Sequence, residues 1–274
     1  MTHAMVKARD GTRLYAEAHG EGIPLIFSCA FCTTRENWRG QVDPLTAAGA
    51  RVILWDYRGH GRSGAPSDPD AYHIDRVVED LGAVLDWAAP GEAAVLAGLS
   101  FGGLASLHFA HRHPARARGL VLVGSGPGFK KPAALEDWKA LVERTAGFLE
   151  TRGLAEFVAG KAGATCIGRD PELPAARAAA AAIVEQDPHA VAQFGRRVAG
   201  LAPPILDELP DIRCPALVIV GEWDKPFLRA AEVMTAKLPR ATRVTVPDAG
   251  HIVNIEAGEA FNAEVSRFLR GLTT

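Results

Sequence analysis

The sequence predicts an α/β fold, with a mostly parallel central sheet flanked by helices and an inserted helical cap, or lid. Up to residue 124, short apolar segments alternate with segments of helical periodicity, as in a parallel sheet covered on both faces. From about residue 128 to residue 206 only helical patterns appear, and strand patterns resume after that. We therefore expect residues 1–127 and 207–274 to form the α/β core and residues 128–206 to form the cap.

Composition and charge narrow the class of protein. The chain has 274 residues, of which 48% are hydrophobic and 23% charged, so a large core can be buried in one large domain or two small ones. A net charge of −2 and a pI near 6.5 argue against a nucleic-acid or anionic-membrane partner. No apolar run reaches the roughly 18 residues of a membrane span, and residues 1–7 lack the apolar core of a secretion signal. We expect a cytoplasmic protein, and the sequence leaves its oligomeric state open.

The expected strands are short and apolar. The first two form a hairpin, because Asp10-Gly11 separates alternating segments at 6–9 and 12–18. Continuous apolar segments of the fully buried kind follow them. These segments are residues 24–28, 51–56, 93–97, 119–124 and 216–221, and a further strand is expected at residues 242–246.

The helices are predicted from periodicity and from their boundaries. Residues 74–88 carry apolar side chains at helical spacing. The other core helices are expected at residues 38–48, 100–112, 228–238 and 257–272. In the cap, prolines separate helical segments at residues 138–150, 154–159, 175–186 and 190–199.

The segment from Val95 to Gly103 combines a buried strand, a serine between two glycines and a helix of small residues. The pattern Gly98-x-Ser100-x-Gly102 fits a sharp strand-to-helix turn that raises one hydroxyl above the sheet edge. A side chain at either glycine would collide with a neighbouring element across so tight a bend. The helix N-terminus then offers N–H groups to a negative charge beside the serine. A loop without chemistry is the competing interpretation, so the case needs an acid and a histidine later in the chain.

Two such residues follow later strands, at the sheet edge where ligands of open α/β sheets bind. Asp224 lies in the loop after the strand at 216–221, and His251 lies in the loop after the strand at 242–246. A serine hydroxyl is a poor nucleophile until a base removes its proton. We predict that His251 is this base for Ser100 and that Asp224 orients its imidazole.

Other acids and histidines compete for these roles. Glu222 and Asp248 lie in the same two loops, and we favour Asp224 because two or three loop residues are needed to turn a carboxylate toward His251. Five of the other histidines have structural interpretations, since several of them suit a helix C-terminus. They are His60 in a glycine-rich loop, His189 in the cap, and His108, His111 and His113 at one helix end.

The four cysteines are at positions 29, 32, 166 and 214. Cys29-x-x-Cys32 has the spacing of a redox or metal half-site, but no second pair of ligands at suitable spacing accompanies it. We interpret these cysteines as buried, small apolar residues near a pocket and expect no bound metal.

Four motifs together resemble the α/β-hydrolase superfamily over nearly the whole chain. They are Asp56-x-Arg58-Gly59-x-Gly61-x-Ser63, Gly98-x-Ser100-x-Gly102-Gly103, Gly221-x-x-Asp224 and Gly250-His251. Within the superfamily the chain is most similar to small bacterial esterases and enol-lactone hydrolases. The resemblance implies a serine hydrolase without metal or organic cofactor. Such an enzyme would cleave a small-molecule ester or lactone through an acyl-enzyme on Ser100.

The resemblance also assigns the oxyanion hole to the backbone N–H groups of Phe31 and Phe101. Many relatives have His-Gly after the strand that ends here at Ser28, and Cys29-Ala30 takes that place in this chain. Loss of one oxyanion donor costs about 2.7–4 kcal/mol, so an efficient enzyme needs this loop intact. If Ala30 takes φ > 0 where relatives have glycine, we expect strain on the order of 1 kcal/mol there.

A mainly apolar substrate pocket is expected beside these motifs, although ordinary core positions would show the same pattern. Beyond Phe31 and Phe101, its candidate residues are Cys32, Phe129, Trp138, Trp223, Ile252 and Val253. Arg196-Arg197 could meet a substrate carboxylate, but a solvated helix face explains this pair better.

Ser100 also limits the reaction. Haloalkane dehalogenases and epoxide hydrolases of this fold use aspartate as nucleophile and are therefore disfavoured. A carbon–carbon bond hydrolase and a cofactor-free perhydrolase or haloperoxidase use a similar triad and stay open. A ligand-binding member with little catalysis is the alternative from another class, and the unusual Cys29-Ala30 loop motivates it.

Overall fold

The computed structural model describes residues 1–272 and contains an eight-stranded sheet in the order β1-β2-β4-β3-β5-β6-β7-β8. The strands are β1 (Thr2–Lys7), β2 (Arg13–His19), β3 (Ile23–Ser28), β4 (Ala50–Trp55), β5 (Ala94–Leu99), β6 (Ala117–Val123), β7 (Ala216–Gly221) and β8 (Ala241–Val246). β2 pairs antiparallel with β1 and with β4, and all other neighbours are parallel. The predicted fold class is confirmed.

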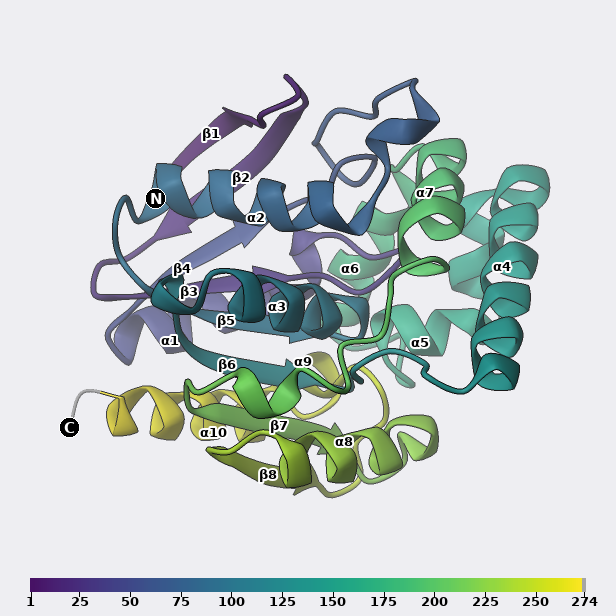
Figure 1. The fold of residues 1–274 in the computed structure, drawn as a ribbon. Coiled ribbons are helices and arrows are strands. Elements are labelled where there is room, and N and C mark those ends of the chain that lie inside the picture. The colour runs from purple at the N-terminus through teal and green to yellow at the C-terminus, as the bar shows by residue number, and fades with distance from the viewer. Residues whose placement is uncertain (273–274) are drawn as a thin grey trace.

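Helices cover both faces of this sheet (Figure 1). In the core they are α1 (Val42–Ala47), α2 (Ile74–Ala88), α3 (Phe101–Arg112), α8 (Lys225–Lys237), α9 (Val253–Glu256) and α10 (Gly258–Gly271). α2 packs beside α3 over one face, and α1 contacts α10. The central strands β3, β5 and β6 are buried almost throughout, because these helices exclude water from both faces.

Between β6 and β7 the chain forms a group of helices, which we call the helical segment. Its helices are α4 (Pro132–Ala159), α5 (Ala164–Ile167), α6 (Pro174–Val184) and α7 (Pro188–Phe194), and α7 continues into a π-helical turn, η5 (Gly195–Ala199). Gly153, with φ 77° and ψ 171°, interrupts α4 where the sequence predicts two separate helices. Figure 1 shows the helical segment beyond the carboxyl ends of the parallel strands. It therefore lies over the edge that carries the predicted site.

One expected helix of the core differs from the structure. Residues 38–48 were expected to form one helix, but the structure has a 3₁₀-helix, η1 (Arg35–Gln41), followed by the short α1. Pro44 explains the break, because it lacks the N–H that a continuous α-helix needs at this position. The helix expected at residues 257–272 is present as α10; the short α9 precedes it, and Ala257 lies between them in a non-helical conformation.

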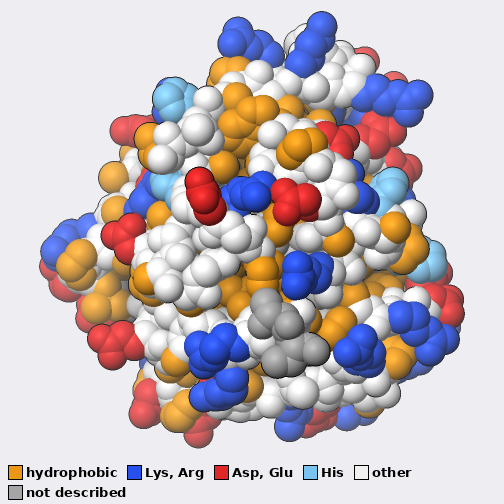
Figure 2. All heavy atoms as spheres, turned by 90° about the vertical axis from the view of Figure 1, so that its left-hand side faces the viewer, with side chains coloured by type: hydrophobic (Ala, Val, Ile, Leu, Met, Phe, Trp, Pro, Cys, Tyr) orange, Lys and Arg blue, Asp and Glu red, His pale blue; other side chains and the backbone are white. Residues whose placement is uncertain are grey.

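The face opposite the helical segment carries mixed charge (Figure 2). Lysine and arginine side chains alternate with aspartate and glutamate, and no broad patch of one sign appears where described residues form this face. Within residues 1–272 no helix is both long and apolar enough to cross a lipid bilayer.

Candidate active site

Ser100 forms the sharp turn between β5 and α3. Its φ of 55° and ψ of −116° lie outside the usual regions for a residue with a side chain. Glycines make the turn possible: a Cβ at Gly98 would lie 2.2 Å from the backbone of Gly102, and one at Gly102 would lie 2.3 Å from the carbonyl oxygen of Ser28. Strained backbone of this kind is concentrated at functional sites. The turn leaves Ser100 partly exposed at the carboxyl edge of the sheet.

Asp224 and His251 meet at the same edge. His251 Nδ1 lies 2.8 Å from Asp224 Oδ2, and both side chains are largely buried. The ring of Phe227 stacks on the imidazole with centroids 4.8 Å apart. A carboxylate at this distance fixes the ring orientation and directs Nε2 away from Asp224.

The end of β6 brings the third residue to this pair. The Ser100 N–H donates to the carbonyl of Val123 (2.9 Å), the last residue of β6. A Cβ on the next residue, Gly124, would lie 3.0 Å from both Asp224 Oδ2 and His251 Nδ1. The end of β6 thus contacts both the Ser100 turn and the Asp224–His251 pair.

The competing acids have other contacts. Glu222 is exposed and its carboxylate accepts the N–H of Asp248 (3.1 Å).

Among the other histidines, His60 is buried and its Nδ1 faces the Arg58 carbonyl at 3.3 Å. Burial lowers the pKa of His60 to about 4. His108 faces the carbonyl of Pro203 at 3.1 Å and is also buried.

The loop after β3 makes a tight turn at the predicted oxyanion position. Both the N–H (3.2 Å) and the hydroxyl (3.0 Å) of Thr33 donate to the carbonyl of Ala30. In a trans peptide the N–H points opposite to the C=O, so the N–H of Phe31 is directed away from Thr33. Among described residues nothing accepts this N–H. The N–H of Phe101, at the first position of α3, has no acceptor within the helix either.

Positive φ in this loop is found at Cys32, with φ of 70°. Ala30 does not have positive φ, so the strain considered for that residue does not arise. With the Ala30–Thr33 hydrogen bond, positive φ at the third residue is typical of a type II turn, whose geometry places the requirement on Cys32. The cost of such a conformation is about 1–2 kcal/mol for a residue with a Cβ.

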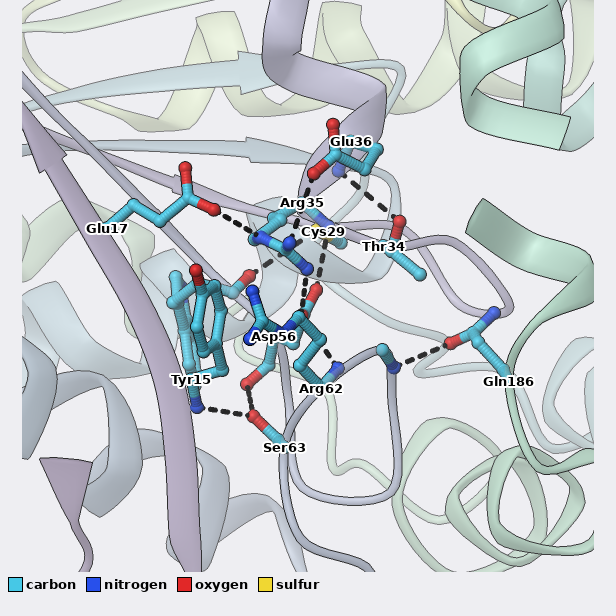
Figure 3. Close-up of polar contacts among 12 residues, drawn as sticks. Tyr15, Glu17, Cys29, Thr34, Arg35, Glu36, Asp56, Arg62, Ser63 and Gln186 are labelled. Carbon is cyan, nitrogen blue, oxygen red and sulfur yellow. Dashed lines mark hydrogen bonds and ion pairs between the residues drawn. The ribbon is translucent and has the colours of Figure 1, made fainter. Parts of the chain in front are cut away.

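A buried ion-pair network holds the end of the loop after β3, which carries Phe31 and which we call the oxyanion loop (Figure 3). Arg35 contacts Asp56 at 2.6 Å and Glu17 at 2.8 Å, and its backbone N–H donates to Asp56 Oδ1 at 2.9 Å. Burial raises the pKa of Asp56, and the charge of Arg35 opposes that rise. Hydrogen bonds from Arg39 and Arg35 outweigh burial at Glu17, whose pKa is lowered. The network fixes the chain only three residues after Cys32.

The glycine-rich motif after β4 completes this network. The N–H of Arg62 donates to Asp56 Oδ2 (3.0 Å), and the hydroxyl of Ser63 donates to the Asp56 carbonyl (2.7 Å). Gly61 has φ of 51°, and a Cβ there would lie 2.3 Å from Asp56 Oδ2. The positions of Gly61 and Ser63 in the motif are thus explained by the buried Asp56 and the turn that closes over it.

Gln186 joins the helical segment to both of these loops. Its amide Nε2 donates to the carbonyl of Cys32 (3.1 Å), and its Oε1 accepts the N–H of Gly61 (3.1 Å). Figure 3 shows this side chain pointing toward the turn that precedes Arg62. Gln186 is buried, so both hydrogen bonds are shielded from water.

Aromatic rings also connect the helical segment to the predicted oxyanion donors. The ring of Phe194 in α7 lies 5.3 Å from that of Phe101 and 5.2 Å from that of Tyr57. A Cβ at Gly195 would lie 2.5 Å from the ring of Phe31, so the start of η5 rests directly on that ring. The surroundings of both predicted oxyanion donors are therefore aromatic and apolar.

The predicted pocket residues fall in three places. Cys32, Ile252 and Val253 are fully buried in the hydrophobic core, and burial raises the pKa of the Cys32 thiol. Phe129 and Trp138 pack together with ring centroids 5.7 Å apart, where the chain enters the helical segment. Trp223 is 51% exposed, and its ring lies under the guanidinium of Arg169. Contact with substrate stays a prediction for all six.

No cluster of three or more His, Cys, Asp or Glu side chains suited to a metal ion occurs within residues 1–272. Cys29, Cys32, Cys166 and Cys214 are all free thiols.

Comparison with known proteins gives the family. The family model described as the alpha/beta hydrolase fold matches residues 23–258. The chain belongs to the α/β-hydrolase fold family. As a hydrolase of this family, it has relatives that align over almost its whole length. The putative carbamate hydrolase RutD of Caulobacter sp. (strain K31) is 30% identical over 270 residues, covering 94% of this chain and 96% of that protein.

Two solved α/β-hydrolase structures show the same agreement over the full chain. A thermophilic esterase from Thermogutta terrifontis has a TM-score of 0.84 and 26% identity, covering 100% of this chain and 99% of that one. The enol-lactonase from Burkholderia xenovorans LB400 has a TM-score of 0.80 and 28% identity, covering 98% and 100%. The resemblance to small bacterial esterases is thus confirmed.

Three residues beside the site were missed from the sequence. Gln186 and Arg169 lie in the helical segment, and Glu256 follows His251 in α9. Gln186 and Arg169 belong to no motif, because their contacts with Cys32 and Glu256 span long sequence separations. Glu256 also contacts Gly250 and Ile252, which are six and four residues away in the sequence. Arg169 has a local signal in the preceding Gly168, which marks a helix end.

Proposed function

We propose that this α/β-hydrolase cleaves a small carboxylic ester or lactone through an acyl-enzyme on Ser100. The observation that carries the proposal is the 2.8 Å contact between His251 Nδ1 and Asp224 Oδ2 at the edge where Ser100 forms its strained turn. This arrangement leaves Nε2 of His251 free to accept the serine proton.

In the first half of the reaction, Ser100 Oγ attacks the carbonyl carbon while His251 Nε2 takes its proton. Asp224 stabilises the imidazolium that forms. The carbonyl oxygen becomes an oxyanion between the N–H groups of Phe31 and Phe101, which have no other acceptor among the described residues. When the tetrahedral intermediate collapses, His251 returns the proton to the leaving alkoxide.

In the second half, water replaces the alcohol. His251 removes a proton from water, the hydroxide attacks the acyl carbon, and the same N–H groups stabilise the second oxyanion. Collapse releases the carboxylic acid and returns the proton to Ser100. With a lactone, acid and alcohol remain in one product molecule.

The surroundings of the site support an uncharged acyl group. The side chains around the proposed oxyanion donors are Phe31, Phe101, Tyr57 and Phe194. The buried charges nearby are engaged in pairs with one another, as Arg35 is with Asp56. The esterase and the enol-lactonase of similar structure support the ester and lactone arms of the proposal.

Covalent labelling tests the mechanism. A fluorophosphonate should form one adduct at Ser100, found by peptide mass spectrometry, and Ser100→Ala should abolish it. The same variant should lose at least about 10³-fold in ester turnover, as expected when the nucleophile of a triad is removed. Labelling elsewhere, or unchanged turnover in Ser100→Ala, would refute the proposal.

Substrate class is tested separately. Initial rates should be compared on p-nitrophenyl esters of increasing acyl length, lactones and aryl carbamates, with Ser100→Ala as the blank. We expect the highest kcat/KM on a short uncharged ester or a lactone. Faster turnover of carbamates would replace this substrate class with that suggested by the Caulobacter relative. Binding without turnover on every arm would favour the ligand-binding alternative.

A further inference from the structure

We propose that Arg169, a residue of the helical segment, is a positioning residue that holds the Asp224 and His251 loops in their catalytic arrangement. The inference rests on the proposed function and adds to it a residue that lies outside the triad. It also gives the helical segment a direct influence on the base.

Arg169 touches both loops at once. Its Nε lies 2.5 Å from a carboxylate oxygen of Glu256, and its terminal nitrogen donates to the backbone carbonyl of Asp248. Its guanidinium lies 3.7 Å from the ring centroid of Trp223, the neighbour of Asp224. One side chain thus makes a hydrogen bond and a cation–π contact to one residue of each loop and an ion pair to Glu256 in α9.

Glu256 connects Arg169 to the backbone on both sides of His251. Its carboxylate accepts the N–H groups on either side of the histidine, from Gly250 (3.0 Å) and from Ile252 (3.3 Å). The Glu256 side chain is only 4% exposed, while that of Arg169 is 38% exposed. A buried carboxylate needs a positive partner, and among its contacts in the described chain Arg169 is the cation that meets this need. Removing Arg169 therefore disturbs the carboxylate that supports the His251 backbone.

Glycines on both sides make the close approach possible. A Cβ at Gly250 would lie 2.9 Å from Glu256 Oε1 and 3.1 Å from Arg169 Nε. Gly168 has φ of 94°, and a Cβ there would lie 3.0 Å from Cγ of Glu256. The contact surface between the helical segment and the His251 loop is therefore fitted closely around this ion pair.

The test uses Arg169→Met, which keeps an unbranched apolar stem but removes the charge and the donors. Arg177→Met is the matched control, because Arg177 is also a half-exposed arginine of the helical segment and pairs only with the local Glu172, at 3.2 Å. We expect the fluorophosphonate labelling rate of Ser100 and kcat to fall about 10-fold in Arg169→Met, with KM changed less than about two-fold. The control should change neither.

Two further variants separate positioning from general destabilisation. Arg169→Lys keeps the charge beside Glu256 and should restore part of the labelling rate, whereas its effect on melting temperature should resemble that of Arg169→Met. In a double-mutant cycle, adding Glu256→Gln to Arg169→Met should cost less than the two single effects combined, because the residues act as one unit.

The outcomes distinguish the two proposals. If the wild type neither labels nor turns over any ester, the proposed function fails and this inference falls with it. If the wild type reacts at Ser100 and Arg169→Met reacts equally fast, the inference alone is overturned. A loss carried entirely by KM, or an equal loss in Arg177→Met, would overturn it as well.

Discussion

The two halves of the candidate site are held in different ways. The oxyanion loop is supported by a buried network that consists of the Arg35–Asp56 ion pair and the neutral amide of Gln186. The His251 loop is supported by one ion pair whose arginine is over a third exposed. Both supports come partly from the helical segment, so its packing bears on the oxyanion donors and on the base alike. The two supports differ in how exposed they are to water and dissolved salt.

This contrast follows from what each half has to do. An oxyanion hole works by preorganised donors in a water-excluded site, so mobile or solvated supports would weaken it. A general base has to accept and release a proton, which tolerates a support that is partly solvated. The structure therefore predicts that buried substitutions affect the oxyanion half strongly, and that solution conditions affect the histidine half more.

Gly102→Ala should have the largest effect. Its new Cβ would lie 2.3 Å from the Ser28 carbonyl and 2.7 Å from that of Cys29, both backbone atoms that cannot move freely. The oxyanion loop would be displaced from the Ser100 turn, and we expect kcat to fall at least about 100-fold, the range for loss of one oxyanion donor. Steady-state kinetics and a melting curve measure it, with Gly147→Ala, which has no atom within 4 Å of the added Cβ, as control. Unchanged kcat would contradict the close contact.

The burial of His60 should make the free energy of unfolding depend on pH. Burial lowers the pKa of His60 to about 4 in the folded chain, whereas an unfolded histidine titrates near 6.5. Between these values the unfolded state binds the proton and the folded state does not, so stability falls as pH drops through this window. The loss reaches about 3 kcal/mol by pH 4.

Urea unfolding at several pH values between about 7 and about 4 measures this loss. His60→Phe, which keeps a ring against Phe194 (4.6 Å between centroids in the wild type), should have a shallower slope. Equal slopes would mean that His60 is not held neutral by burial.

The fold could be predicted from the sequence because its signals are local. Buried parallel strands are continuous apolar runs, and Ser100, Asp224 and His251 each follow such a run at the edge where strand ends meet. Gly98 and Gly102 could be interpreted because a tight turn leaves no room for a Cβ. Each of these features can be predicted from a few residues that are neighbours in the sequence.

The supports of the site could not be predicted in this way. Gln186 contacts Cys32 across 154 positions, and Arg169 contacts Glu256 across 87. Such pairs depend on how the helical segment sits on the core, which no local pattern encodes. Resemblance to relatives raised Ala30 only as a position where positive φ would cause strain, and the turn places positive φ at Cys32 instead. The type II geometry of the turn, rather than the residue type, determines this position.

Substitution of Gln186 should have the next smaller effect on kcat. It tests the contact of Gln186 with the oxyanion loop. In Gln186→Leu the Cys32 carbonyl and the Gly61 N–H lose their partner while the volume is roughly kept, and we expect kcat to fall about 10-fold. Gln186→Glu keeps an acceptor for Gly61 but places carboxylate oxygen against the Cys32 carbonyl, so its loss should be larger. Stopped-flow labelling and steady-state kinetics measure both. If Glu is tolerated better than Leu, the donor to Cys32 is not the important contact.

Salt should produce the smallest effect and the clearest separation of the two halves. Raising the ionic strength from about 0.05 M to about 1 M shortens the screening length to roughly 3 Å and weakens the half-exposed Arg169–Glu256 pair, whereas Arg35–Asp56 is shielded by burial. We expect the labelling rate of the wild type to fall about two-fold, and that of Gln186→Leu to fall by the same factor because its histidine half is intact. Arg169→Met should show no such fall, because this variant lacks the Arg169–Glu256 ion pair that salt would screen. Equal salt dependence in Arg169→Met and the wild type would place the salt-sensitive contact elsewhere in the molecule.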